Sequence, residues 1–318
     1  MRKNPKELLL IITAMSGYLE YGDASLLFKS ISNRNRVIKE CKNANYIAIS
    51  SSKGLRTIHL RSDGKKYVRE HYPEVSVYEY YTGDLEAKKR RCVIGKALCH
   101  MALMEIPVGE QNEGCYFKLK MDGAGTDRGY RTGRMVGIYS TPYTDYMTYQ
   151  LAEAGIRWND RREASQAALI HAKRKKEVGM LVLAKGMSAL AEILENTDLT
   201  EAEKMYRRSK GTLRIHLGDN NMPFYYIPVT DVQTATLELK ILGDMEIRNL
   251  LESTFGQEGE NVLIPLDVRK LYGLYKEPHS KVVYVLESHE EYVRGLLKRH
   301  QVIGIPVDGL RDALAKEG

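Results

Sequence analysis

The stretch YIAISSSKGLRTIHLRSDGKKYVREHY, residues 46–72, constrains the fold more than any other part of the chain. Two runs rich in β-forming residues, YIAIS and LRTIHL, are separated by the polar segment SSKG, in which Gly54 can adopt a positive φ. This pattern predicts a β-hairpin with Lys53 at its tip. The segment that follows, RSDGKKYVREHY, predicts a helix capped by Ser62 or Asp63.

Three helices are predicted before the hairpin. Apolar residues recur at helical spacing over residues 5–22, and ASLLFKSI, residues 24–31, predicts a short second helix. The segment SNRNRVIKECKNAN, residues 32–45, predicts a third helix opened by Ser32 or Asn33. Three helices, a hairpin and a further helix form the element order of a winged helix-turn-helix.

Positive charge is concentrated in the same part of the chain. The formal net charge is +7, but residues 1–100 hold 19 Lys and Arg against 10 Asp and Glu, whereas residues 101–318 hold 29 against 31. Such segregation is typical of a phosphate-binding module attached to a near-neutral body. A solvated charged surface would produce the same count, so charge alone does not decide between the two interpretations.

Winged modules place their third helix in the major groove of DNA and their hairpin against flanking phosphates. We therefore expect DNA contacts from polar and basic side chains of these two elements. The expected residues are Asn33, Arg34, Asn35, Arg36, Lys39, Lys53 and Arg56. The asparagines suit adenine edges, and the arginines suit guanine or phosphates. The alternatives are a solvated polar surface and a winged domain used for protein contact.

Two further basic segments follow the hairpin. DLEAKKRRCVIGKALCHMALMEI predicts a long helix, whose KKRR run at residues 88–91 either extends a DNA-binding surface or is merely solvated. The glycine-rich segment at residues 111–135 predicts a long loop, in which Arg128, Arg131 and Arg134 recur beside glycines and could hold phosphates. This loop, and residues 122–134 in particular, contains no Walker-type motif. The four cysteines show no ligand spacing and predict buried, reduced thiols.

From residue 134 onward, predicted strands and helices alternate and indicate a mixed sheet flanked by helices. We therefore predict an α+β or α/β protein with three regions. Residues 1–82 form a winged helix-turn-helix DNA-binding domain, residues 83–200 a helix followed by an α/β domain, and residues 201–318 a C-terminal α/β region.

Two family resemblances accompany these patterns. Residues 5–72, with NANYIAIS followed by TIHLRSDGKKYV, resemble the winged helix-turn-helix class. The layout, with GRMVGIYSTPYTDYMTYQL followed by a helix and the strand MLVLA, resembles the replication-relaxation proteins of plasmids and integrative conjugative elements. Those proteins join a winged domain to a body related to the PD-(D/E)XK nuclease fold. The resemblance implies binding of double-stranded DNA in replication initiation, conjugative transfer or its regulation, with a degenerate nuclease-like body.

An active nuclease is the alternative function. That fold needs an Asp and a Glu to hold a divalent ion and a Lys two residues after the Glu. The hairpin at 135–150 offers Gln150 where a carboxylate is needed, and only Asp145 in its turn. ATLELKIL predicts a strand that carries two further candidates. The complete candidate set is Asp219 or Asp231, with Glu238 and Lys240.

If this strand is an antiparallel edge strand, the alternation of its side chains would instead place Glu238 and Lys240 side by side on a solvated face, with no catalytic role. Mg²⁺ is expected only for the nuclease, and no cofactor otherwise.

No run reaches the roughly 18–20 apolar residues of a membrane span, and the charged start MRKNPKE does not fit a signal peptide. We therefore expect a cytoplasmic protein with no membrane partner. Beyond double-stranded DNA, the partners considered are a second copy of the chain and other replication or transfer proteins. A protein-interaction scaffold is the third functional interpretation.

Overall fold

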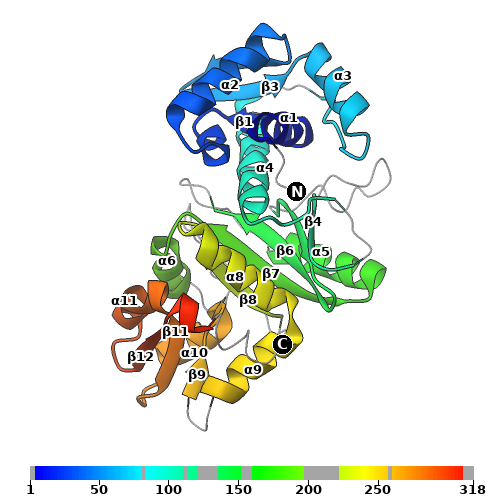
Figure 1. Ribbon diagram of the computed structural model, residues 1–318. Coiled ribbons are helices and arrows are strands. Elements are labelled where there is room, and N and C mark those ends of the chain that lie inside the picture. The colour runs from blue at the N-terminus through cyan, green and yellow to red at the C-terminus, as the bar shows by residue number, and fades with distance from the viewer. Residues whose placement is uncertain are drawn as a thin grey trace. The chain divides into compact units, whose positions relative to one another are not determined.

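The computed structural model describes residues 4–80, 83–109, 113–119, 135–151, 160–196, 222–256 and 260–310. It is a mixed α+β protein in which N-terminal helices precede a mixed sheet (Figure 1). The chain divides into two compact units. Unit 1 comprises Met1–Asn112 and Tyr116–Ala124, and unit 2 comprises Glu113–Cys115 and Gly125–Gly318.

Unit 1 begins with helix α1 (Pro5–Ser16), whose first turn is capped by the side chain of Asn4. The helix ends earlier than predicted because Gly17 adopts a left-handed φ of 80°. The short strand β1 (Leu19–Glu20) follows, and the predicted second helix is the 3₁₀ helix η1 (Asp23–Leu27). Helix α2 (Ile31–Asn43) is the predicted third helix, but it is capped by Ser30 rather than by Ser32 or Asn33.

The predicted hairpin is confirmed. Strands β2 (Ile47–Ser52) and β3 (Leu55–Leu60) pair antiparallel, and the pairing of Ser52 with Leu55 leaves a two-residue turn. Lys53 and Gly54 in this turn both have positive φ, 46° and 83°, as the twist of a tight hairpin requires. Strand β1 pairs with the other side of β3, so the sheet order is β1-β3-β2.

Two more helices complete the described core of unit 1. Helix α3 (Ser62–His71) directly follows the hairpin, and α4 (Leu85–Leu103) begins at Asp84, whose carboxylate caps it. Cys41, Cys92 and Cys99 are buried free thiols as predicted, and burial raises the pKa of the Cys92 thiol to about 12.

The segment predicted as a long loop is only partly described. Its residues Tyr116–Leu119 form strand β4, and three of these four side chains are buried. The loop prediction is therefore wrong at this point. Glycine and lysine on both sides hid a short run, YFKL, that has strand composition. Cys115, just before β4, is half-buried rather than buried.

The main sheet of unit 2 carries a buried parallel centre. Its strands β5 (Gly137–Ser140), β6 (Thr144–Gln150), β7 (Glu177–Ala184), β8 (Phe224–Pro228) and β10 (Leu266–Asp267) follow the order β10-β8-β7-β6-β5. The β6–β7 and β7–β8 pairs are parallel, whereas β5–β6 and β8–β10 are antiparallel. Helix α5 (Asp160–Arg174) connects β6 to β7, and α6 (Ser188–Asn196) follows β7. The near-continuous apolar run that predicted β7 is confirmed.

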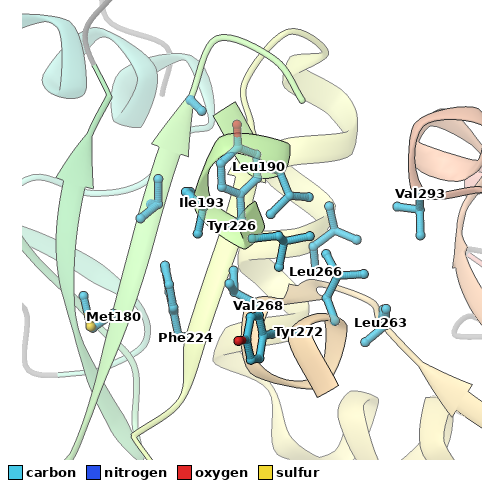
Figure 2. Packing of buried hydrophobic residues seen from close by; sticks show 14 of the residues in the cluster. Met180, Leu190, Ile193, Phe224, Tyr226, Leu263, Leu266, Val268, Tyr272 and Val293 are labelled. Carbon is cyan, nitrogen blue, oxygen red and sulfur yellow. The ribbon is translucent and has the colours of Figure 1, made fainter. Parts of the chain in front are cut away.

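A second, fully parallel sheet lies in the same unit. Strands β9 (Glu260–Val262), β11 (Val282–Leu286) and β12 (Gln301–Ile305) pair in the order β12-β11-β9. Helices α9 (Met245–Phe255) and α11 (Glu287–Leu296) pack on it, whereas α10 (Val268–Lys276) packs on β8 and β10 of the main sheet. One apolar cluster joins Phe224 and Leu266 of the main sheet to Val283 and Val285 of the second sheet and to Val293 of α11. Figure 2 labels Phe224, Leu266 and Val293 of this cluster.

The predicted strand ATLELKIL is wrong, because these residues lie in helix α8 (Val232–Gly243). Asp231 starts the helix, since its carboxylate accepts from the Gln233 amide at 3.0 Å and from the Thr234 hydroxyl at 2.5 Å. Within the described ranges, no helix is both long and apolar enough to cross a membrane.

Candidate nucleic-acid interface

The exposed side of α2 carries most of the predicted DNA-contact residues. The helix buries Val37, Ile38 and Cys41 against unit 1. The exposed positions of its first two turns recur at spacings of three and four residues and so form one stripe. With the next turn included, they are Ile31, Ser32, Asn35, Arg36, Lys39 and Glu40. Ile31 is 66% exposed, which is unusual for so large an apolar side chain.

Tyr21, between β1 and η1, connects α2 to the hairpin. The guanidinium carbon of Arg56, on β3, lies 3.8 Å from the centre of the Tyr21 ring, and that of Arg34, on α2, lies 4.8 Å from it. The Tyr21 amide also donates to the Arg56 carbonyl at 2.9 Å. Cation–π attraction therefore holds cations from two elements at one ring. Tyr21 was not predicted as a site residue, because no local spacing in the sequence relates it to either arginine.

The hydrogen-bond donors of the Arg34 guanidinium are bonded to other residues of unit 1. Its Nη1 donates to Ser25 Oγ at 2.6 Å. Its Nε and Nη2 both donate to the side-chain oxygen of Asn35, Oδ1, at 3.1 and 2.9 Å. The Tyr21 hydroxyl donates to the same oxygen at 3.3 Å. Arg34 is half-buried, so it acts as a support for Asn35.

Arg36 is held only loosely. Its Nη1 donates to Glu40 Oε1 at 2.5 Å and its Nη2 to Asn33 Oδ1 at 3.0 Å, but 64% of its side chain is exposed. An exposed pair of this kind is worth about 0.3–0.5 kcal/mol, so a phosphate or base can redirect the guanidinium at little cost. Lys39 and, in the hairpin turn, Lys53 are likewise exposed.

The seven predicted residues thus fall into three groups. Arg34, Asn35 and Arg56 are brought together through Tyr21, whereas Asn33 pairs with Arg36. The lysines extend the basic surface along the helix and to the hairpin turn. Of the glycine-rich loop, Arg128, Arg131 and Arg134 lie outside the described residues.

The KKRR run of α4 is divided between the interior and the surface of unit 1. Arg91 is buried, with its guanidinium carbon 3.6 Å from the centre of the Tyr78 ring, and burial lowers its pKa. Lys89 pairs with Glu86 at 2.9 Å, and Arg90 lies 3.9 Å from Asp84, both near the start of the helix. Arg91 is thus committed to the interior, whereas Lys89 and Arg90 are each more than half exposed, in pairs as weak as that of Arg36 with Glu40.

The residues of the nuclease alternative do not come together. Lys240 is exposed, whereas Glu238 is fully buried, because residues two apart on a helix point about 200° away from each other. The prediction that they lie side by side on an exposed sheet face is therefore wrong. Asp231 caps α8, and Asp219 lies outside the described residues. Among the described side chains, no group of three or more His, Cys, Asp or Glu is placed to hold a metal ion.

Glu238 instead faces a histidine. Its Oε1 lies 3.2 Å from Nε2 of the buried His289 at the start of α11, and Nδ1 of that ring lies 3.3 Å from Ser288 Oγ. Burial lowers the pKa of His289, but the Glu238 carboxylate, with smaller contributions from Ser288 and Asp231, raises that pKa above its usual value. A Ser–His–Glu chain is the order of a nucleophilic triad, but its histidine must start neutral to take a proton. The pair is therefore better suited to joining α8 to α11.

A second buried polar cluster closes the β5–β6 turn. Asp145, fully buried at the start of β6, accepts from Ser140 Oγ at 2.6 Å and pairs with Arg174 at the end of α5. Lys176 donates to the Thr141 carbonyl at 2.6 Å. Gln150, at the other end of β6, donates to the Leu183 carbonyl at 3.2 Å. These groups satisfy one another and fix the strand ends.

Comparisons of the chain with models of known protein families, with curated proteins and with solved structures found no match. Function is therefore inferred from the chain's own residues and geometry.

Proposed function

We propose that the chain is a sequence-specific double-stranded DNA-binding protein, with unit 1 as a winged helix-turn-helix. In this proposal α2 is the recognition helix and the β2–β3 turn is the wing. The observation that carries it is the Tyr21 contact with Arg34 and Arg56, which links α2 to the hairpin. The short connection from η1 to α2 and the sheet order β1-β3-β2 also support it.

Electrostatics add to this support. The exposed face of α2 offers Arg36 and Lys39, and the wing offers Lys53 and Arg56. Such cations bind phosphates with release of counterions, which gives affinity, and side chains in the major groove give specificity. Because the Arg36 pair with Glu40 is exposed, DNA can replace it without a large desolvation cost.

For unit 2 we propose a degenerate PD-(D/E)XK-like body that contributes contacts with a second copy or with other replication or transfer proteins. The antiparallel β5–β6 pair, the crossover helix α5 and the parallel strand β7 support this kinship. Gln150, where a metal-binding carboxylate would be needed, supports the loss of catalysis. We keep the three regions predicted from the sequence, residues 1–82, 83–200 and 201–318. The biological role we propose is replication initiation, conjugative transfer or its regulation in a mobile element.

The full-length protein tests the proposal. Fragments bound from random double-stranded DNA should converge on a common sequence, for which Arg36→Ala should reduce affinity by about 1–3 kcal/mol. Lys53→Ala should weaken specific and random DNA alike and reduce the salt slope by about one. The matched control is Lys270→Ala, which removes an exposed cation paired with Glu252 on unit 2 and should change neither affinity. Absence of any enriched sequence, or equal losses for all three variants, would reject the proposal.

A further inference from the structure

We propose that Asn35 is a specificity-determining residue that reads guanine, and that Arg34 and Tyr21 are positioning residues that fix its amide for this task. The inference rests on the proposed DNA-binding function and specifies which base pair that surface prefers. It replaces the expectation, drawn from residue type alone, that Asn35 reads adenine.

The chemistry of the neighbours determines the orientation of the Asn35 amide. A guanidinium group carries only donors, so the Asn35 atom that receives both Nε and Nη2 of Arg34 must be the carbonyl oxygen. The Tyr21 hydroxyl brings a third donor to this oxygen at 3.3 Å. A carbonyl oxygen has two lone pairs, so its capacity is filled.

Arg34, which holds the Asn35 oxygen, is itself fixed by further contacts. Arg34 donates its remaining Nη1 to Ser25 Oγ at 2.6 Å, and its guanidinium carbon lies 4.8 Å from the Tyr21 ring centre. Rotating the amide of Asn35 by half a turn would place its NH₂ group against a cation that has nothing but donors. The neighbouring Asn33 differs, because its oxygen receives one donor from the loosely held Arg36.

Asn35 is exposed on the stripe that faces DNA in the proposed function, and what it offers there is its NH₂ group. Adenine is read by Asn through one accepted and one donated hydrogen bond, to N6 and N7. With the oxygen occupied, the adenine N6 amine has no acceptor. Guanine presents two adjacent acceptors, N7 and O6, whereas cytosine presents a donor. A donor-only amide therefore favours guanine over adenine and disfavours cytosine.

The test begins with selection of bound sequences by the wild-type full chain and by Asn35→Ala. The position whose preference disappears in Asn35→Ala is then measured with each of the four base pairs. We expect guanine there to be bound on the order of 10- to 100-fold more tightly than adenine. Replacing that guanine with 7-deazaguanine, which lacks the N7 acceptor, should lower the affinity of the wild type but not that of Asn35→Ala.

The positioning role has its own readout. Combining Arg34→Met with Tyr21→Phe frees the Asn35 oxygen, so the guanine-to-adenine ratio should fall toward one while preferences at other positions persist. Arg36→Ala is the control and should keep the ratio. Thermal unfolding of each variant, together with Tyr21→Phe alone as the milder change, shows whether the fold is retained.

Three results would overturn the inference while leaving DNA binding intact. These are an adenine preference at the Asn35 position, an equal loss for all sequences in Asn35→Ala, and an unchanged ratio in the folded double variant. Failure of the proposed function is distinct, since the wild type would then enrich no sequence in the first selection.

Discussion

Replacing Glu238 with Ala should destabilise unit 2, and most strongly at low pH. The Glu238 side chain is fully buried and that of His289 is 4% exposed, with 3.2 Å between Oε1 and Nε2. Removing the carboxylate leaves the histidine with its Ser288 contact but takes away the partner of Nε2. The helices α8 and α11 lose the polar link that joins them.

The magnitude follows from the burial of both groups. Removing one partner of a buried ion pair costs about 3–5 kcal/mol, because the other group stays in the apolar interior without compensation. Glu238→Gln keeps an acceptor and removes only the charge, so we expect about 1–3 kcal/mol. The double variant Glu238→Leu with His289→Leu replaces the pair by apolar groups and should recover most of the loss.

The pH dependence has a definite sign. In the wild type the pKa of His289 is raised, so its contribution to stability is fully present below about pH 6.5 and is lost as the pH rises through the folded-state pKa. Asp231 also raises this pKa, but less than Glu238 does. In Glu238→Ala, burial outweighs what remains and lowers the pKa, so stability then increases with pH. The difference between the two proteins should therefore be larger at about pH 6 than at about pH 8.

Urea unfolding followed by circular dichroism at both pH values measures the free energies. Hydrogen exchange of amides in α8 and α11, with those of α1 as an internal control, shows that the effect lies in unit 2. A loss under about 0.5 kcal/mol at pH 6, the scatter of surface substitutions, would refute the reasoning. So would an equal loss at the two pH values.

Two further predictions concern unit 1. Gly64→Ala should lower the free energy of unfolding by about 1–3 kcal/mol, because the added Cβ would lie 2.1 Å from the Tyr46 carbonyl oxygen. In the control Gly22→Ala the added Cβ meets nothing within 4 Å, so stability should not change. Equal melting temperatures of the two variants would contradict this. Arg91→Met should change stability by less than about 1 kcal/mol, because the buried Nε has no hydrogen-bond partner in the described parts of the chain, a cost that offsets the Tyr78 ring contact and the long 3.5 Å bond from Nη2 to the Met15 carbonyl. DNA affinity should also be unchanged, and a lower affinity in the folded variant would return the KKRR run to the DNA-binding surface.

Sequence patterns predicted unit 1 well where they were local. The Lys53–Gly54 turn needs positive φ at both positions, and alternating runs on each side of it leave few alternatives to a hairpin. The start of α2 was displaced only slightly, because Ser30, Ser32 and Asn33 are all good capping residues and tertiary packing chose among them.

The α8 segment shows where local patterns fail. From Leu237 to Ile241 apolar and charged residues alternate, which is the pattern of a half-buried strand. The helix forms because Asp231 caps it and because Glu238 can be buried. That burial depends on His289, which comes 51 residues later in the chain. No window of the sequence contains this information.

The same limit applies to the charge count. Of the basic residues in unit 1, Arg91 is buried, Lys65 pairs with Glu79 and is 11% exposed, and Lys96 lies 3.5 Å from Asp23. Arg34 supports Asn35. Each of these raises the net charge of residues 1–100 without offering a free cation to phosphate. The number of phosphates that the proposed interface can neutralise is therefore set by exposed cations such as Lys39 and Lys53. The salt dependence of binding should be that of a few phosphate contacts, fewer than the excess of nine basic residues (19 against 10) in residues 1–100.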